Sequence, residues 1–233
     1  MGKRIIQQRR GRGSPTYRVR KKASKNIKVG YPSNLNGEYE VIKLFSLSNN
    51  SAPIAKLKNQ KGEIFHYLAI KNLYVGQKIN YGGDKPGDIA QLKDIKLGTN
   101  ICNIEHTLYD GGKFIKTGGN SGLLQNQNNG KATILMPSKK EKVFDLNTRA
   151  TIGVLAGDGI KEKPILKAGK QFHIKKSKSK LWPRTSAVSM NAIDHPFGSG
   201  RGKRVKSKIA KRNASPGKKV GLIRPRRTGR KKR

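Results

Sequence analysis

Short apolar runs separated by polar turn residues occupy the middle of the chain. The runs are rich in Val, Ile, Leu and aromatic residues, a composition typical of strands. Glycine- and asparagine-rich breaks such as "NQKG", "GGDKPGD" and "QNNG" separate them. No helical periodicity persists for three turns. The pattern predicts strands within residues 38–48, 52–59, 63–70, 78–82, 131–137, 142–146 and 150–157.

The spacing of these runs predicts a mainly β chain with two modules. Strand runs at roughly regular intervals with glycine-rich turns are typical of small barrels or sandwiches. A break near "KLGTN" at 96–100 divides the middle into residues 35–97 and 98–170. The flanking segments, 1–34 and 171–233, contain too few apolar residues to offset the entropy of ordering. We therefore expect two folded modules between two extended arms.

Charge sharpens this division. The chain carries 52 Lys and Arg against 13 Asp and Glu, a net charge of +39. Residues 1–34 hold 11 of the basic residues and no acid, and residues 171–233 hold 21 and a single acid. A compact protein of this charge repels itself, and a polyanionic partner removes the repulsion. Nucleic acid is the first candidate for that partner, and an anionic membrane surface is the second.

The pattern of the arms favours nucleic acid over a membrane. Neither arm has the apolar helical face of a membrane-bound segment, and no run of about 18 apolar residues could span a bilayer. The N-terminal "MGKRIIQQRRGRG" lacks the apolar segment of a secretory signal. Tyr17, Trp182 and Phe197 lie among the charges, as in RNA-binding surfaces, where unstacked bases need a flat partner and a counterion. The alternative is a pair of disordered, solvating tails.

One stretch, "NAIDHPFGSGRGKR" at 191–204, raises the question of catalysis. Asp194 and His195 could form an acid–base pair, but the sequence offers no marked nucleophile as a third partner. Asp194 is the only acid of the C-terminal arm, so it needs neutralisation. The candidates are His195, Arg184, Arg201, a magnesium ion or backbone N–H groups in a turn. We expect the pair to shape an RNA-contacting loop, with catalysis as the alternative.

Glycines and cations follow in the same stretch. Gly198 and Gly200 would allow the backbone to approach sugar-phosphate closely, and Pro196 biases the residue before it toward an extended conformation. The basic residues that would supply charge beside them are Arg201, Lys203 and Arg204. The alternative is a flexible Gly/Ser linker.

Two further basic groups are candidates because of their positions. Lys163, Lys167 and Lys170 in "KPILKAGK" are expected to form one basic edge of the second barrel, unless they are ordinary surface lysines. Arg149 opens a strand and is expected to contact RNA; the alternative is a surface salt bridge with Asp145.

Cysteine and histidine usage argues against a metal or disulfide role. A single cysteine, Cys102, excludes an internal disulfide and a cysteine-rich zinc site, and its apolar neighbours predict a buried thiol. The four histidines are scattered without metal-ligand spacing. We expect no metal site, no intrinsic cofactor and no catalytic residues.

Five stretches follow one another along the chain: "RRGRGSPTYR", "TRATIGVLAG", "KEKPILKAGK", "WPRTSAVSMNAIDHPFGSGRGK" and "PGKKVGLIRPRRTGRKK". Together they resemble the universal large-subunit ribosomal protein family called L-two (L2) in bacteria and L-eight in the eukaryotic cytosol, in its archaeal and eukaryotic form. The chain departs from the family pattern at Thr185–Ala187, where an arginine is common. The resemblance implies an OB-like barrel (35–97), an SH3-like barrel (98–170) and arms that penetrate large-subunit rRNA near the peptidyl-transferase region.

The resemblance also implies the partners. They are large-subunit rRNA, other ribosomal proteins and a contact with the small subunit, with magnesium associated with the rRNA and no membrane or small-molecule substrate. The chain would act in cytoplasmic ribosomes, in assembly and translation. A free-standing RNA or DNA chaperone and an enzyme using Asp194 and His195 are the alternatives. The predicted RNA-binding residues are Arg9, Arg10, Arg12, Tyr17, Arg18, Arg149, Lys163, Lys167, Lys170, Trp182, Arg184, Met190, Asn191, Asp194, His195, Pro196, Phe197, Gly198, Gly200, Arg201, Lys203, Arg204, Arg224, Arg226, Arg227 and Arg230.

Overall fold

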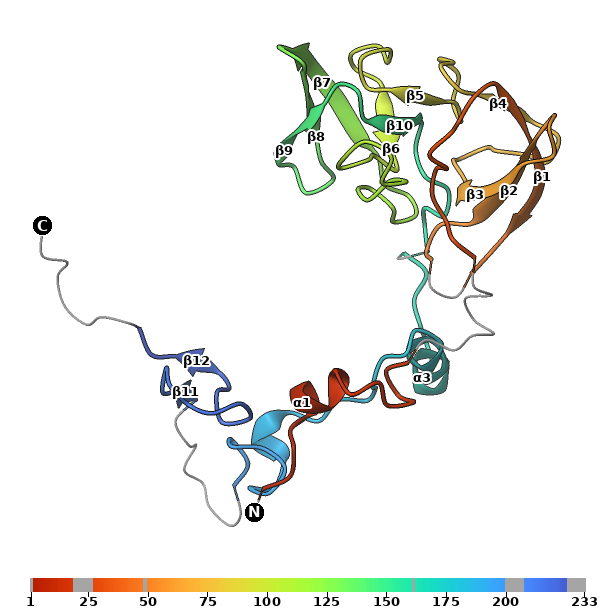
Figure 1. Cartoon of the computed structure of the whole chain (residues 1–233). Helices are drawn as coiled ribbons and strands as arrows, with labels where there is room; N and C mark the ends of the chain where they lie inside the picture. The colour runs from red at the N-terminus through yellow and green to blue at the C-terminus, as the bar shows by residue number, and fades with distance from the viewer. Residues whose placement is uncertain (1, 19–26, 48–49, 161, 200–207, 226–233) are drawn as a thin grey trace, which may run out of the picture. The chain divides into compact units, whose positions relative to one another are not determined.

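The chain divides into two compact units in a computed structural model (Figure 1). The barrel unit comprises residues 21–166, and the arm unit comprises residues 1–20 together with residues 167–233. The arm unit therefore combines both ends of the chain. The structure describes residues 2–18, 27–47, 50–160, 162–199 and 208–225.

The first sheet of the barrel unit is antiparallel, with strand order β3-β2-β1-β4. Its strands are β1 (Glu38–Phe45), β2 (Ile54–Asn59), β3 (Ile64–Leu68) and β4 (Lys78–Asn80). Tyr39 and Val41 of β1 are buried on either side of the exposed Glu40, as the two-residue period of a strand requires. The pairing of β1 with β2 shifts between Val41 and Lys43, a bulge that bends the sheet.

The second sheet is also antiparallel and has strand order β5-β10-β6-β7-β8-β9. Strand β10 pairs with β5 on one side and β6 on the other, and all four of its residues are buried. The turn between β7 and β8 consists of Asn129 and Gly130, both with positive φ, as a tight two-residue hairpin needs. The strands are β5 (Ile89–Gln91), β6 (Asn100–Cys102), β7 (Gly122–Asn128), β8 (Lys131–Leu135), β9 (Glu141–Asp145) and β10 (Arg149–Ile152).

The two sheets share one hydrophobic core. Isolated bridges join Tyr81 to Ile89 and Ile70 to Leu155, so each sheet continues into the other at two places. Leu57 of the first sheet and Ile101 of the second belong to the same buried cluster and have no solvent exposure. The barrel unit is therefore stabilised as a whole by apolar burial, the main favourable term in folding.

The arm unit contains short elements and little core. They are α1 (Ile6–Arg10), α3 (Ala168–Ser177), the 3₁₀ turn η1 (Ala187–Ser189), β11 (Ile209–Ala210) and β12 (Leu222–Ile223) (Figure 1). Neither α1 nor α3 has a buried residue. Among the described residues of this unit, the buried side chains are those of Ile5, His195 and Ala210. No helix within the described ranges is long and apolar enough to cross a membrane.

The mainly β class is confirmed, and the two sheets are compatible with two barrel-like modules. All seven predicted strand regions contain a strand. Strands β5, β6 and β7 were not predicted, since β5 and β6 have only three residues and β7 reads "GLLQNQN". Strand β5 precedes the break expected at 96–100 and yet belongs to the second sheet.

Candidate nucleic-acid interface

Three segments that are distant in the sequence pack together in the arm unit. The N–H of Lys3 donates to the carbonyl of Ile193 over 2.8 Å, and the side chain of Ile5 is buried. The Ile5 N–H donates to Oε1 of Gln8 over 3.1 Å, which caps the start of α1. The same Gln8 side chain lies so close to Gly217 that a Cβ there would come within 2.8 Å of it. The two ends of the chain thus form one basic body.

The loop from Asn191 to Gly198 is held by its own backbone. The N–H groups of Asp194 and His195 both donate to the Asn191 carbonyl, over 3.0 and 3.2 Å, and the Gly198 N–H donates to the His195 carbonyl over 2.8 Å. A Cβ at Gly198 would overlap the carbonyl oxygen of Asn191. Glycine at this position therefore lets the loop close on itself.

Asp194 is neutralised by Lys3, a residue outside the predicted set of partners. Its Oδ1 lies 3.4 Å from Nζ of Lys3, and both side chains remain partly exposed to solvent. Of the candidate side-chain partners, neither His195 nor Arg184 forms an ion pair with it in the described part of the chain, and Arg201 lies outside that part. The pairing joins the C-terminal arm to the N-terminal arm.

His195 is an interior group of this loop. Its side chain is 8% exposed, and its Nδ1 accepts the backbone N–H of Phe197 over 3.1 Å. An accepting Nδ1 places the proton of the neutral ring on Nε2. The ring centroid lies 5.0 Å from that of Phe197. These contacts let His195 hold the shape of the loop, and no group of three or more potential metal ligands occurs among the described residues.

Phe197 connects the loop to the last part of the chain. Gly221 has a φ of +75°, and a Cβ there would overlap the Phe197 ring and the carbonyl of Lys208. Lys208 accepts the N–H of Leu222 over 2.9 Å, beside the parallel pairing of β11 with β12. The aromatic ring is therefore packed against backbone, where only glycine leaves room for it.

The predicted cations of the arm unit that lie in the described part of the chain are exposed to solvent. Arg9 is tethered, because its Nε donates to the carbonyl of Arg4 over 2.9 Å. Tyr17, Trp182, Met190 and Phe197 are half-buried. The exposed members of the predicted set are Arg9, Arg10, Arg12, Arg18, Lys167, Lys170, Arg184, Asn191, Pro196 and Arg224. Exposed guanidinium and ammonium groups around half-buried rings can contact phosphates and bases together.

The three lysines predicted to form one edge of the second barrel are divided between the two units. Lys163 belongs to the barrel unit, whereas Lys167 directly precedes α3 and Lys170 lies within it, in the arm unit. They are therefore not one edge of the second barrel. The sequence did not predict α3 at this point, because the helix lacks an amphipathic pattern.

Arg149 is a buried structural residue. Its Nη2 lies 2.6 Å from Oε1 of Glu105, and its Nε and backbone N–H both donate to Oε2, over 3.0 and 3.1 Å. Nη1 donates to the carbonyl of Pro32 over 2.8 Å. The side chains of Arg149 and Glu105 are 1% and 0% exposed. In this structure Arg149 has no surface to offer a phosphate, and its ion-pair partner is Glu105 rather than Asp145.

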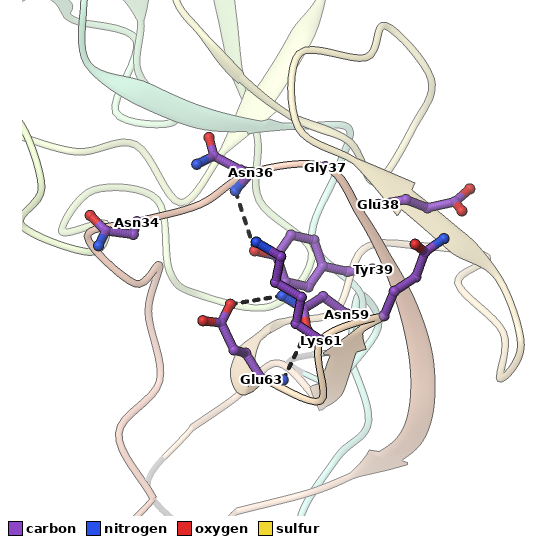
Figure 2. Close-up of a pocket in the computed structure, with 9 residues that line it drawn as sticks. Asn34, Asn36, Gly37, Glu38, Tyr39, Asn59, Lys61 and Glu63 are labelled. Atoms are coloured by element: carbon purple, nitrogen blue, oxygen red, sulfur yellow. Dashed lines mark hydrogen bonds between the residues drawn. The ribbon is translucent and has the colours of Figure 1, made fainter.

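A polar cleft in the barrel unit has the wrong charge for a phosphate (Figure 2). It lies beside the start of β1 and the β2–β3 turn and encloses about 430 Å³. Two carboxylates, Glu38 and Glu63, line it against one cation, Lys61. Asn59 donates from Nδ2 to Glu63 over 2.7 Å, so part of its polar surface is already satisfied. We therefore exclude this cleft from the nucleic-acid interface.

Cys102 is inert in the folded state. The free thiol is fully buried, as predicted from its neighbours, and burial raises its pKa to about 12. Because the thiolate is the reactive form, this thiol should neither react nor bind metal at neutral pH.

Sequence comparisons place the chain among known proteins. The family described as Ribosomal Proteins L2, C-terminal domain, matches residues 85–217. Large ribosomal subunit protein uL2 of Archaeoglobus fulgidus is 44% identical, over 98% of this chain and 99% of that protein. The protein of the same name from Saccharolobus islandicus is 40% identical, over 99% of both.

The chain belongs to the L2 family.

Membership of the L2 family, in its archaeal form, makes this a large-subunit ribosomal protein. The family match covers the whole second sheet, α3 and the 191–198 loop. It begins at residue 85, between β4 and β5, in agreement with the point at which the second sheet starts.

The predicted RNA-binding residues of this L2-family chain leave out three exposed residues of the arm unit, Lys3, Phe172 and Lys176. Lys3 was overlooked because 191 positions separate it from Asp194, and no sequence pattern marks such a pairing. Phe172 is an exposed aromatic residue among lysines. It therefore has the same pattern, an aromatic ring among positive charges, that singled out Tyr17. Seven predicted residues lie outside the described part of the chain, namely Gly200, Arg201, Lys203, Arg204, Arg226, Arg227 and Arg230.

Proposed function

We propose that this protein is a structural constituent of the large ribosomal subunit that binds large-subunit rRNA near the peptidyl-transferase region. One observation carries the proposal. The described part of the arm unit holds 19 Lys and Arg and a single acid, Asp194, and Lys3 already neutralises that acid. A surface of one sign attracts a polyanion and releases its counterions on binding. Assembly of the subunit and translation would both depend on this contact.

The arm unit supplies the kinds of contact that RNA needs. Exposed arginines such as Arg10 and Arg12 would bind phosphates, and half-buried rings such as Tyr17 would stack on unpaired bases. The barrel unit, which carries nearly all the acids, would contact other ribosomal proteins and the small subunit. The protein would act in cytoplasmic ribosomes without a membrane or small-molecule partner.

No chemical step is assigned to the chain itself. His195 and Asp194 would position rRNA by fixing the 191–198 loop, through the contacts to Phe197 and Lys3. Magnesium ions in this region would be bound by rRNA phosphates, which prefer such hard cations. The chain would need no cofactor of its own.

Recovery from cells tests the ribosomal assignment. A tagged full-length chain should sediment with large-subunit particles and copurify with their rRNA in equal amounts. Recovery only in soluble complexes that lack rRNA would overturn the assignment. It would favour a free-standing basic chaperone.

Directed cleavage tests the location. Cys102 is the only cysteine of the chain. A chain with both Cys102→Ala and Ser189→Cys therefore carries a single thiol, next to the 191–198 loop, to which an iron-based cleavage reagent can be attached. Cleavage of assembled subunits should map to rRNA of the peptidyl-transferase region. A matched chain with Ser138→Cys, an exposed residue of the barrel unit, should cut elsewhere. Identical cleavage patterns from the two positions would contradict the proposed location.

A further inference from the structure

An aromatic cavity lies between the two arms, within the arm unit. It encloses about 270 Å³ and is lined by Pro15 and Thr16 of the N-terminal segment together with side chains from α3 and the residues after it. Sites for drug-sized ligands begin at about 300 Å³, so this one suits a single flat group. The C-terminal members of its lining are Phe172, Lys176, Lys180, Leu181 and Trp182.

Two aromatic rings that keep part of their surface exposed line this cavity. Phe172 lies on α3, a helix with no buried residue, and its side chain is 39% exposed. Trp182, the only tryptophan of the chain, is half-buried. Large aromatic side chains usually bury their area in a core or an interface. Rings held at the surface beside Leu181 and Pro15 offer the flat apolar partner that an unstacked base requires.

The same cavity has uncompensated positive charge. Lys176 and Lys180 line it, and none of its lining residues is acidic. The Nζ of Lys176 lies 5.6 Å from the centroid of the Phe172 ring, which places a cation beside the proposed stacking surface. A phosphate attached to a bound base would come within reach of these ammonium groups and neutralise them.

The two arms build the cavity in advance of any ligand. Ser179 donates from Oγ to the carbonyl of Arg18 over 2.7 Å, which fixes the N-terminal segment against the residues that follow α3. The N–H groups of Tyr17 and Arg18 both donate to the Ser14 carbonyl, over 3.0 and 3.1 Å, and hold Pro15 and Thr16 in a turn. Thr16 adds a hydroxyl that can donate to or accept from a base edge. A site formed before binding loses less entropy when its ligand arrives.

We infer that this cavity binds one unpaired nucleotide of RNA, with the base on Phe172 and Trp182 and the phosphate at Lys176 and Lys180. The inference rests on the proposed rRNA-binding function and adds a defined site to it. Most of the cations of the arm unit would contact paired or unpaired RNA alike. This cavity would accept only a base that is free of its stack.

The fluorescence of Trp182 gives a direct test, because no other tryptophan contributes. Full-length protein is titrated with a single-stranded adenine-rich RNA hexanucleotide and, separately, with a short RNA duplex of equal charge. The single strand should quench the fluorescence, while the duplex should bind without quenching. Equal quenching by both, or by neither, would overturn the inference. Quenching by an acidic peptide but not by RNA would indicate a protein partner and would also overturn it.

A variant pair isolates the contribution of stacking on Phe172. Phe172→Ala keeps the tryptophan and should weaken binding of the hexanucleotide by about five- to a hundredfold, the usual effect of removing one base stack. Val188→Ala, which truncates an exposed apolar residue outside the cavity, should leave it unchanged. Phe172 is exposed on a helix without buried residues, so its truncation should not unfold the chain.

The outcomes for the site and for the proposed function can be told apart. If Phe172→Ala leaves hexanucleotide affinity unchanged while large-subunit rRNA still binds with a steep salt dependence, the cavity is not a nucleotide site and the proposed function stands. If the unaltered protein binds neither RNA, both fall. Weaker binding of the hexanucleotide with retained, salt-dependent binding of the rRNA is the expected result.

Discussion

The guanidinium of Arg149 and the carboxylate of Glu105 form an ion pair inside the barrel unit, with 2.6 Å between Nη2 and Oε1. Arg149 also donates to the carbonyls of Pro32 and Ser33, which fastens the segment before the first sheet to the second sheet. The Tyr109 ring centroid lies 5.0 Å from the guanidinium carbon. An arginine that the sequence suggested for RNA thus holds the barrel unit together.

Removing one member of this pair should lower the stability of the barrel unit. Arg149→Ala leaves the Glu105 carboxylate buried without a partner, which costs about 3–5 kcal/mol of stability in comparable pairs. Urea denaturation should show this loss. Lys140→Ala, which truncates an exposed residue of the same unit, should change stability by less than about 0.5 kcal/mol. An Arg149→Ala protein of unchanged stability but weaker rRNA binding would show that Arg149 reaches RNA instead.

Two glycine substitutions should differ in their effect on rRNA affinity. Gly198→Ala places a methyl group against the Asn191 carbonyl and should distort the 191–198 loop. Overpacking of this kind costs about 1–3 kcal/mol, so rRNA affinity should fall about tenfold in a filter-binding assay. Gly169→Ala meets nothing within 4 Å and lies in α3, where alanine favours the helix. Equal affinities for the two variants would contradict the role of Gly198.

The thiol of Cys102 should make stability fall at high pH. Burial raises its pKa from 9.0 to about 12, so between these values the unfolded chain loses a proton that the folded chain keeps. The resulting stabilisation is complete below pH 9 and is lost as the pH rises toward 12. As the pH rises from 8 to 10.5, the free energy of unfolding measured in urea should therefore fall by about 2 kcal/mol less for Cys102→Ala than for the unaltered protein. Parallel losses in the two proteins would contradict the buried thiol.

His195→Ala should impair assembly of the subunit more than the chemistry of assembled particles. The substitution removes the acceptor of the Phe197 N–H and leaves a void in the loop. In reconstitution, the yield of large subunits should fall, while the particles that do form should make peptide bonds at a near-normal rate. Asp194→Asn, which alters only a partly exposed ion pair, should have the smaller effect on yield. Normal yield with abolished peptide-bond formation would instead support a catalytic histidine.

The barrel unit could be predicted from the sequence only where local signals agree. β-branched and aromatic runs such as "EIFHYLAI" marked all four strands of the first sheet and β8, β9 and β10 of the second. Strand β7 contains Gln and Asn and lies between glycine-rich breaks, so its local β-propensity is low. It forms a strand because it pairs with β6 and β8. Strands β5 and β6 are too short to show any period.

The interface was predictable in composition but not in its detailed pairings. Charge and aromatic residues selected the arms, whereas the Asp194–His195 pair, the glycines and the family resemblance selected the 191–198 loop. The pairing of Asp194 with Lys3 and of Arg149 with Glu105 depends on long-range packing, which a sequence does not display. Burial decided the role of Arg149, since the same guanidinium at the surface would have served a phosphate equally well.

The salt dependence of rRNA binding tests the central claim that the arm unit forms the RNA interface. The affinity of the full chain for a large-subunit rRNA transcript is measured from about 50 to 400 mM salt, the range over which binding to phosphates weakens. Replacing Arg10, Arg12 and Arg224 by Gln should reduce the slope of log K against log salt by about 2 to 3, close to one for each phosphate that is no longer neutralised. Replacing Lys93, Lys131 and Lys140 of the barrel unit, which are also exposed, should leave the slope unchanged. Equal slopes for the two triple variants would contradict an interface in the arm unit.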